Sequence, residues 1–378
     1  MEKIIKDVVF QGVLTGEHGF TDTCIFDVNG TDLGIPVYSK KENSLWLFFG
    51  DTFSTPLPSD ENWRGTVIGK IQKLYFENGI KVDNFVSDQN GKAMGLIKHH
   101  KCKNEEEFEV TKIAQGAIEI NGVMYAFYES IRRWGEPGYW DVNYSGAIKS
   151  KDGGKSWERV YDLSWVCDIT KYLGVVKQLV QEKEDFSPSD IDIDVKKHYC
   201  PHFGQIYSFL GNDGYIYITG RKGGRQFGVV IGRVKPEQFE KFDEYEYYVI
   251  KDNERCWVKG SEGLKIINEN EENCCIIEKP VSNLTIAFNK YLNKYLSVYF
   301  KPYVGVVLRK SDTPYGPFLE EELIIKVGDE KLPFNHTSLY GGFTHELLSK
   351  DNGKTIYIIV SQWNSLFYGS EVLSVEFK

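Results

Sequence analysis

The sequence predicts an all-β fold, a five-bladed β-propeller with short helical insertions, formed by residues 1–378 as a single domain. Three observations favour this fold. Short apolar or alternating runs recur along the chain, tight turns containing Asn or Gly separate them, and 14% of the residues are aromatic. Aromatic and β-branched runs between such turns are typical of sheets rather than of helices.

Five similar runs recur, and we expect each to be the second strand of a blade. A run of this kind follows a glycine or asparagine turn and ends near a small or polar residue, as repeated blades require. The five runs are LWLFFGDTF (45–53), GVMYAFYES (122–130), GYIYITGR (214–221), NKYLSVYF (293–300) and KTIYIIVSQW (354–363). The repeat is degenerate, so four blades, six blades or a two-sheet sandwich with insertions stay open.

Few segments have the period of a helix. The clearest is KYLGVVKQLVQEKED (171–185), which predicts a surface helix within an insertion at about 166–199. Shorter candidates are residues 104–110 and 235–242.

The stretch SKDGGKSW (150–157) matches the pattern S-x-D-x-G-x-x-W, the Asp-box of sialidase-like propellers. An Asp and Gly turn of this kind joins the outer strands of a blade, with the tryptophan packed under it. The motif supports a propeller and carries no chemistry.

Charge and composition exclude several function classes. The net charge is −9, which disfavours nucleic acid and anionic membranes as partners, because both need a basic face. No run of about 18 apolar residues predicts a membrane span. The segment MEKIIKDVVF lacks the apolar stretch of a secretory signal, which leaves the localisation open. The seven cysteines include no CxxC pair, so we expect reduced, mostly buried thiols. Separately, we expect a monomer.

The stretch GTDLGIPVYSKKENSLWLFFGDTF (30–53) reads as a β-hairpin with an aspartate near each end. A turn at KKEN (40–43) would place Asp32 directly opposite Asp51, with Cα atoms about 4.5–5.5 Å apart. Like charges in that position cost stability, and a close carboxylate pair raises one pKa, as a general acid requires. The alternative is that both aspartates only cap turns.

The same hairpin resembles a known family. GTDLGIPV and LFFGDTF, followed by Trp63-Arg64-Gly65, are similar to the start of the domain-of-unknown-function 4185 family. The resemblance continues through GAIEINGVMYAFYES, DGYIYITGRKGGRQFGVVIGRV, NLTIAFNKYLNKYLSVYF and YGGFTHELL, and it covers nearly the whole chain after residue 20.

This resemblance implies a five-bladed propeller similar to arabinanase-type glycoside hydrolases, some of them endo-D-arabinanases. It therefore implies that the partner is a carbohydrate and that the protein hydrolyses a glycosidic bond. Arabinan-type polymers are among the substrates that it implies, and it implies no required cofactor. Glycoside hydrolysis needs two carboxyl groups. Asp32 and Asp51 are the first candidates as catalytic residues. Glu129, at the end of YAFYES, is the next, with a solvent-exposed strand-end charge as its alternative.

One departure from the family pattern affects catalysis. Related sequences carry a glutamate just before the T-I pair of the strand in SNLTIAFN, whereas this chain has Asn283. An amide in place of a carboxylate removes an acid or base, so a non-catalytic, lectin-like glycan-binding propeller is the alternative function.

Sugars are held by aromatic faces and by planar hydrogen-bonding side chains. The candidate substrate-binding residues are Trp63, Arg64, Arg225, Asn283, His336, Tyr340 and Trp363, with Trp134, Trp140 and Arg221 as further candidates. No metal ligands are predicted, although the resemblance to arabinanases makes a structural calcium ion an expectation to measure. A sialidase is disfavoured because no R-I-P motif occurs, and a serine hydrolase because no G-x-S-x-G occurs.

Overall fold

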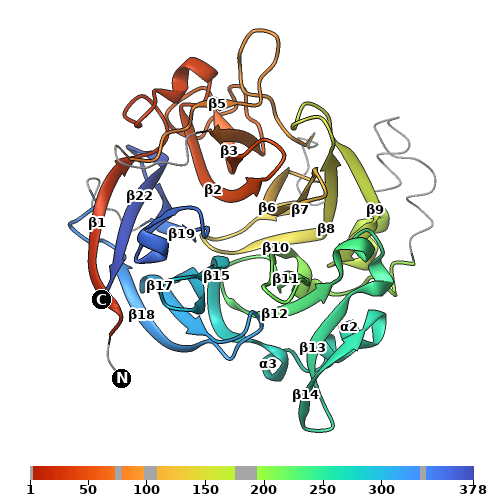
Figure 1. The fold of residues 1–378 in the computed structure, drawn as a ribbon. Helices are drawn as coiled ribbons and strands as arrows, with labels where there is room; N and C mark the ends of the chain where they lie inside the picture. The colour runs from red at the N-terminus through yellow and green to blue at the C-terminus, as the bar shows by residue number, and fades with distance from the viewer. Residues whose placement is uncertain (1–2, 73–78, 98–108, 175–193, 333–337) are drawn as a thin grey trace.

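The computed structural model describes residues 3–72, 79–97, 109–174, 194–332 and 338–378. Strands dominate these residues, as predicted, and Figure 1 shows their sheets arranged around a common centre. Among the described residues, no helix is long and apolar enough to cross a membrane.

Neighbouring strands pair in antiparallel groups, and we call each group a run of strands. Two of these runs are separate four-stranded sheets. The first contains β2 (Gly30–Ser39), β3 (Ser44–Phe53), β4 (Val67–Ile71) and β5 (Asn84–Phe85). The second contains β6 (Thr111–Ile120), β7 (Val123–Trp134), β8 (Trp140–Ser150) and β9 (Glu158–Val166).

A nine-stranded sheet joins two further runs through a short pairing of β12 with β15. Its first run contains β10 (Gln205–Leu210), β11 (Ile216–Arg221), β12 (Phe227–Val234), β13 (Glu246–Lys251) and β14 (Glu254–Lys259). Its second contains β15 (Ile277–Asn289), β16 (Lys294–Lys301), β17 (Gly305–Ser311) and β18 (Leu319–Lys326).

The last sheet joins the two ends of the chain. It contains β19 (Leu339–Phe343), β20 (Ser349–Lys350), β21 (Thr355–Trp363), β22 (Tyr368–Phe377) and the N-terminal strand β1 (Ile5–Val13), which pairs with β22. The backbone N–H groups of Ile4, just before β1, and of Ile5, its first residue, also donate to the Glu322 carboxylate of β18, at 3.0 and 2.9 Å.

The first strands of the five runs surround the centre. β2 contacts β6, β6 contacts β10, β10 contacts β15, β15 contacts β19, and β19 contacts β2. The five runs predicted from the repeat are β3, β7, β11, β16 and β21, and each lies directly outside one of these inner strands. The sequence repeat therefore identified the second strand of every run.

The helices were predicted less well. Residues 169–174 are helical, which agrees with the start of the predicted insertion helix, and residues 175–193 lie outside the described residues. The candidate at 104–110 also falls mostly outside them, and 235–242 contains only the 3-10 turn η4 (Pro236–Gln238) and the start of η5 (Phe242–Glu244). Helices α2 (Gly260–Glu269) and α3 (Glu271–Cys274) were not predicted from the sequence. Helix α2 buries Leu264 and Ile267.

The β2–β3 hairpin has the predicted turn, but its register is interrupted. Ser39 lies opposite Ser44 and Thr31 opposite Thr52, as the symmetry about residues 40–43 requires. Two compensating irregularities lie between Thr31 and Ile35, where Leu33 and Gly34 have φ values of 63° and 94°. The prediction that Asp32 lies directly opposite Asp51 in a regular ladder was therefore wrong, because Asp32 stands at this break.

The N-terminal strand gives the first testable prediction. Val8 is buried in the core, whereas Val9 on the same strand is 46% exposed. Replacing Val8 with alanine removes two buried methyl groups, so we expect the free energy of unfolding to fall by about 1.5 kcal/mol. The matched Val9→Ala change should cost less than about 0.5 kcal/mol. Chemical denaturation of both variants checks this, and equal losses would contradict the position of β1 in the last sheet.

Candidate active site

The break in β2 is held open by the last sheet. The Leu33 N–H donates to Ser361 Oγ at 2.9 Å, and Ser370 Oγ donates to the Leu33 carbonyl at 3.2 Å. Both serines lie on β21 and β22, so the backbone beside Asp32 bonds to another sheet rather than only to β3. A backbone that leaves its ladder in this way re-aims the side chain next to it.

The Asp32 carboxylate fills the space that a glycine leaves on the facing strand. A Cβ atom added at Gly50 would lie 2.2 Å from Asp32 Oδ1. That oxygen is buried and has no hydrogen-bond partner among the described residues, whereas Oδ2 accepts from the Tyr340 hydroxyl at 2.7 Å. In the GDT sequence of β3, Gly50 therefore leaves the space that Asp32 occupies, and Asp51 follows it directly.

Burial raises the pKa of Asp32 to about 6. Hydrogen bonds from Tyr340 and Tyr368 and the positive charge of Arg225 oppose this rise, because each favours the ionised carboxylate. Arg225 lies over the Tyr340 ring, with its guanidinium carbon 4.4 Å from the ring centre. Tyrosine, arginine and carboxylate therefore form one polar group that keeps Asp32 ionised at neutral pH.

Asp51 lies in a different environment. Its Oδ1 accepts from the Trp63 indole N–H at 2.7 Å and from the Thr111 hydroxyl at 3.4 Å. Burial and then the negative charge of Asp32 raise the pKa of Asp51 to about 8. Asp51 is therefore protonated at neutral pH while Asp32 is ionised.

A third carboxylate, Glu129 on β7, completes the cluster. It is 1% exposed, and it accepts from Gln115 Nε2 at 2.6 Å and from the Trp140 indole N–H at 2.9 Å. Its pKa is raised to about 8, mainly by burial and also by the charge of Asp51, while the Trp140 hydrogen bond and the charge of Arg221 oppose the rise. The alternative interpretation of Glu129 as a solvent-exposed charge was wrong, since its strand end faces the interior.

The three carboxylates differ in access. Asp32 and Asp51 are half-buried, whereas Glu129 is almost completely covered. A ligand can therefore reach the two aspartates more readily than Glu129, whose hydrogen bonds are to Gln115 and Trp140. Two neighbouring carboxyl groups with different pKa values, both partly exposed, are what general acid–base chemistry requires.

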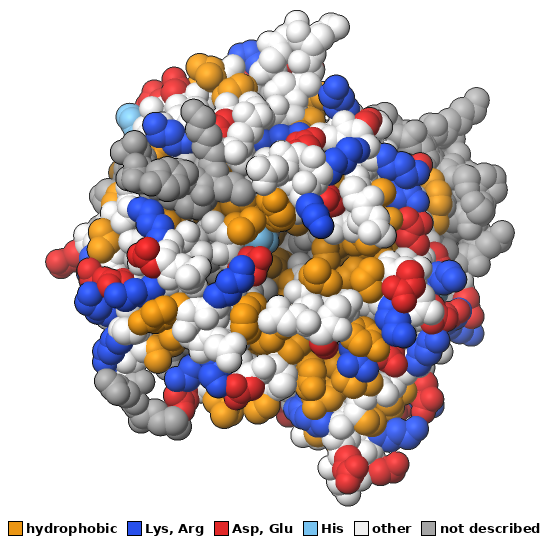
Figure 2. Space-filling model, viewed as in Figure 1, with side chains coloured by type: hydrophobic (Ala, Val, Ile, Leu, Met, Phe, Trp, Pro, Cys, Tyr) orange, Lys and Arg blue, Asp and Glu red, His pale blue; other side chains and the backbone are white. Residues whose placement is uncertain are grey.

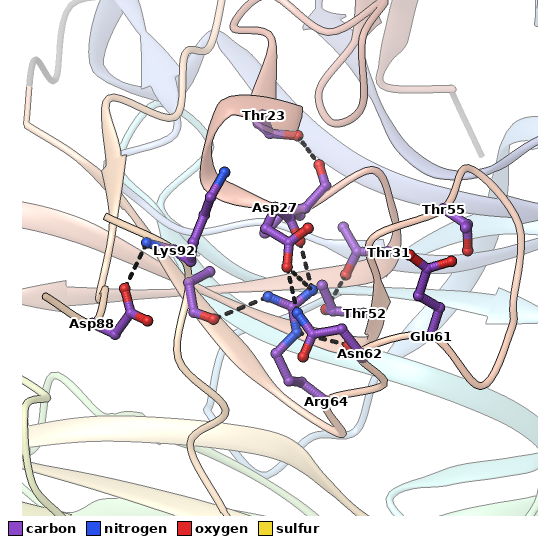
Figure 3. A network of polar contacts seen from close by, with 12 residues as sticks. Thr23, Asp27, Thr31, Thr52, Thr55, Glu61, Asn62, Arg64, Asp88 and Lys92 are labelled. Atoms are coloured by element: carbon purple, nitrogen blue, oxygen red, sulfur yellow. Dashed lines mark hydrogen bonds and ion pairs between the residues drawn. The ribbon is translucent and has the colours of Figure 1, made fainter. Parts of the chain in front are cut away.

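Arg64 lies in another network, shown in Figure 3. Its guanidinium donates to the backbone carbonyls of Ala93 at 2.9 Å and Asn62 at 3.1 Å, and it also contacts Asp27. It is 8% exposed. These contacts account for Arg64 as a residue that fixes the loops around β3, and they do not bring it to the carboxylates.

The other predicted binding residues are spread out. Trp63, Tyr340 and Arg225 contact or face the aspartates, whereas Trp363 is 50% exposed at the end of β21. Asn283 has a φ of 27° in a bulge of β15, and its Oδ1 accepts from Ser282 Oγ at 2.8 Å. His336 lies outside the described residues.

Sequence reasoning missed three contact residues of the cluster: Thr111, Gln115 and Tyr368. Each lies on a strand whose apolar pattern gives no sign of a polar partner, so only the fold reveals the contact. The calcium ion stays an expectation. In the described part of the chain, no three His, Cys, Asp or Glu side chains come together as a metal-binding group.

Solved structures share the fold at low sequence identity. A protein from Bacteroides ovatus whose name suggests a hydrolase is 15% identical, with a TM-score of 0.59 over 93% of this chain and 88% of that one. An arabinanase from Bacillus subtilis is 10% identical, with a TM-score of 0.45 over 92% and 96%. An exo-β-1,3-galactanase from Phanerochaete chrysosporium is 11% identical, with a TM-score of 0.45 over 98% and 64%.

Comparison with curated proteins gives no match. The family model described as "Domain of unknown function (DUF4185)" matches residues 19–373, which include the three carboxylates and every strand except β1 and the end of β22. The chain therefore belongs to the DUF4185 family.

Proposed function

We propose that this protein is a glycoside hydrolase that acts on an oligosaccharide or polysaccharide. The observation that carries the proposal is the pair of half-buried aspartates, Asp32 and Asp51, on facing strands of one hairpin and in different hydrogen-bonding surroundings. Hydrolysis of a glycosidic bond needs one carboxylic acid to protonate the leaving oxygen and one carboxylate on the other side of the bond.

The roles follow from the surroundings of each aspartate. Asp51, protonated beside the Trp63 indole, would donate its proton to the leaving oxygen. Asp32, ionised beside Tyr340 and Arg225, would activate water or attack the sugar carbon. Glu129 would act as a positioning residue through the Gln115 and Trp140 side chains that it binds. The ring face of the half-buried Trp63 would bind the sugar, whereas Tyr340, 5% exposed beneath the Arg225 guanidinium, would support Asp32.

The five runs of strands around the centre would be the five blades of a propeller, with β1 completing the last blade. This count rests on the contacts among the five inner strands and on the sequence repeat. Arabinan-type polymers are the first substrates to test, because the motif resemblance implies them.

The direct test of the function is product analysis. The purified protein is incubated with arabinan, xylan and galactan, and released oligosaccharides are separated and quantified. Cleavage of one polymer supports a hydrolase, and the anomer first released shows whether Asp32 attacks the sugar or activates water. Binding without cleavage of any polymer would favour the lectin-like alternative, which the amide at Asn283 motivates.

Substitution of either aspartate should abolish most of the activity. Asp32→Asn and Asp51→Asn remove the base and the acid while they keep the side-chain shape, so we expect turnover to fall about 10²-fold or more. Turnover is measured on the cleaved glycan, with circular dichroism to check folding. The matched control is Asp312→Asn, whose side chain is 81% exposed. Full activity in a folded aspartate variant would contradict the assignment.

The Tyr340 hydroxyl should set the acidic side of the pH profile. Its hydrogen bond lowers the pKa of Asp32. Tyr340→Phe removes that bond and raises this pKa, so we expect the acidic limb of kcat/KM to move to higher pH. Tyr303→Phe, at an 86% exposed position, is the control. An unmoved limb, or one moved to lower pH, would show that Tyr340 does not support the ionised form.

Stability should depend on pH through Asp51. Its pKa is raised from 3.8 to about 8 in the folded protein, so the folded state binds the proton more tightly than the unfolded state. Stability from this group is complete below about pH 4 and is lost as the pH rises toward 8. The neutral amide of Asp51→Asn avoids this loss, so we expect it to raise Tm at pH 8 and to change Tm little at pH 4. A variant less stable than the parent at pH 8 would contradict the burial of a charged pair.

A further inference from the structure

A cavity lies at the end of the inner strands opposite the carboxylates. We call it the axial cavity. It measures about 580 Å³ and is lined by the ends of β2, β6, β10 and β15 and by the segment after β19. The beginnings of β2, β6 and β19 carry Asp32, Thr111 and Tyr340 at the candidate active site. Figure 2 shows a hollow near the centre of the molecule, among hydrophobic side chains and with a histidine at its edge.

The walls of the axial cavity are apolar and aromatic. Val37, Ile118 and Ile286 line it together with the rings of Tyr207 and Phe209. The two rings are stacked, with centroids 6.1 Å apart and planes inclined by 20°. Both of these rings are almost completely buried, at 6% and 9% exposed, whereas the half-buried rings of Tyr38 and Phe288 also line the cavity. Partly exposed rings in a concave site are what the C–H faces of a sugar ring pack against.

His345 supplies a hydrogen-bond donor at the cavity. The Leu347 N–H donates to its Nδ1 at 3.1 Å, which places the ring proton on Nε2. Burial lowers the pKa of His345 to about 4, so the ring is neutral at physiological pH. His345 and the exposed Glu346 also line an adjoining cavity of about 260 Å³, so both cavities share these two residues.

The charges at the axial cavity balance, with Lys40 and Lys41 against Glu119 and Glu346. Two of the four are already engaged. Glu119 accepts from Ser39 Oγ at 2.6 Å and from the Lys41 N–H at 3.1 Å, and the Lys41 ammonium donates to the Lys151 carbonyl at 2.9 Å. Because the positive and negative side chains at the cavity are equal in number and two of them are already bonded, a neutral ligand is favoured over an anion or a cation.

Amide groups add hydrogen-bonding capacity at the same rim. Asn121 and Asn212, from the turns after β6 and β10, line the cavity beside Lys40 and His345. An asparagine side chain both donates and accepts, as each hydroxyl of a sugar does. The axial cavity thus combines aromatic walls, neutral polar groups and a volume within the usual range for small-molecule sites.

We propose that the axial cavity is a second carbohydrate site, which binds one or two neutral sugar units of a glycan at the end of the molecule opposite the active site. The inference rests on the proposed function for the class of ligand. Such a site would hold a long polysaccharide on the protein without contributing to bond cleavage.

The test is isothermal titration with neutral arabino- and xylo-oligosaccharides, using the Asp51→Asn protein so that no ligand is cleaved. We expect two binding sites. Ala287→Trp places a large ring at a half-buried position that lines both cavities, and His345→Gln changes the donor, so each should weaken one site at least tenfold. Leu366→Trp, at a 76% exposed position, is the control for an added ring.

Three outcomes would overturn the inference: a single site, no sugar bound, or two sites that neither variant weakens. The proposed function is judged separately, by cleavage with the unsubstituted protein. If the protein cleaves a glycan but binds only one equivalent of sugar, the proposed function is supported and the axial site is ruled out. If the protein binds sugar at the axial cavity and cleaves no glycan, the axial site is supported and the hydrolase function is ruled out. With Asp51 intact, Ala287→Trp should leave turnover of a short soluble substrate unchanged.

Discussion

The repulsion between Asp32 and Asp51 is the constraint on which the rest of the site depends. Two neighbouring carboxylates on one hairpin cannot both be charged in partly buried positions without a large cost. The surroundings divide the roles, because Tyr340, Tyr368 and Arg225 support a charge on Asp32, whereas Asp51 has only the indole and hydroxyl donors of its neighbours. The difference in protonation is therefore a property of the fold around the hairpin.

Several sheets contribute to that difference. β2 and β3 carry the aspartates, β7 carries Glu129, and β19 and β22 carry the tyrosines. Arg225 follows β11. Elements this far apart in the chain meet because the inner strands surround one centre, and the pairing of β1 with β22 ties the two ends of the chain together. A costly charge cluster at the centre is tolerated because its neighbours are fixed by many separate strands.

The sequence predicted the parts that depend on local pattern. The turn at 40–43, the second strand of every run and the association of Asp32 with Asp51 follow from alternation, turn residues and symmetry. The break at Leu33 could not be predicted, because Ser361 and Ser370 hold it from more than 300 residues away. The same holds for Arg64 and Glu129, whose partners come from other strands and loops. Polar side chains in strands reveal their role only when their neighbours are known.

The most direct test of the central account is a titration of the aspartate side-chain carboxyl carbons by NMR, with Asp32→Asn and Asp51→Asn used to assign the signals. The account predicts that two coupled aspartates titrate far above the usual value near 4, Asp32 at about 6 and Asp51 at about 8. Two independent titrations near 4 would show that the aspartates are solvated turn residues, and the proposed acid–base pair would then be wrong.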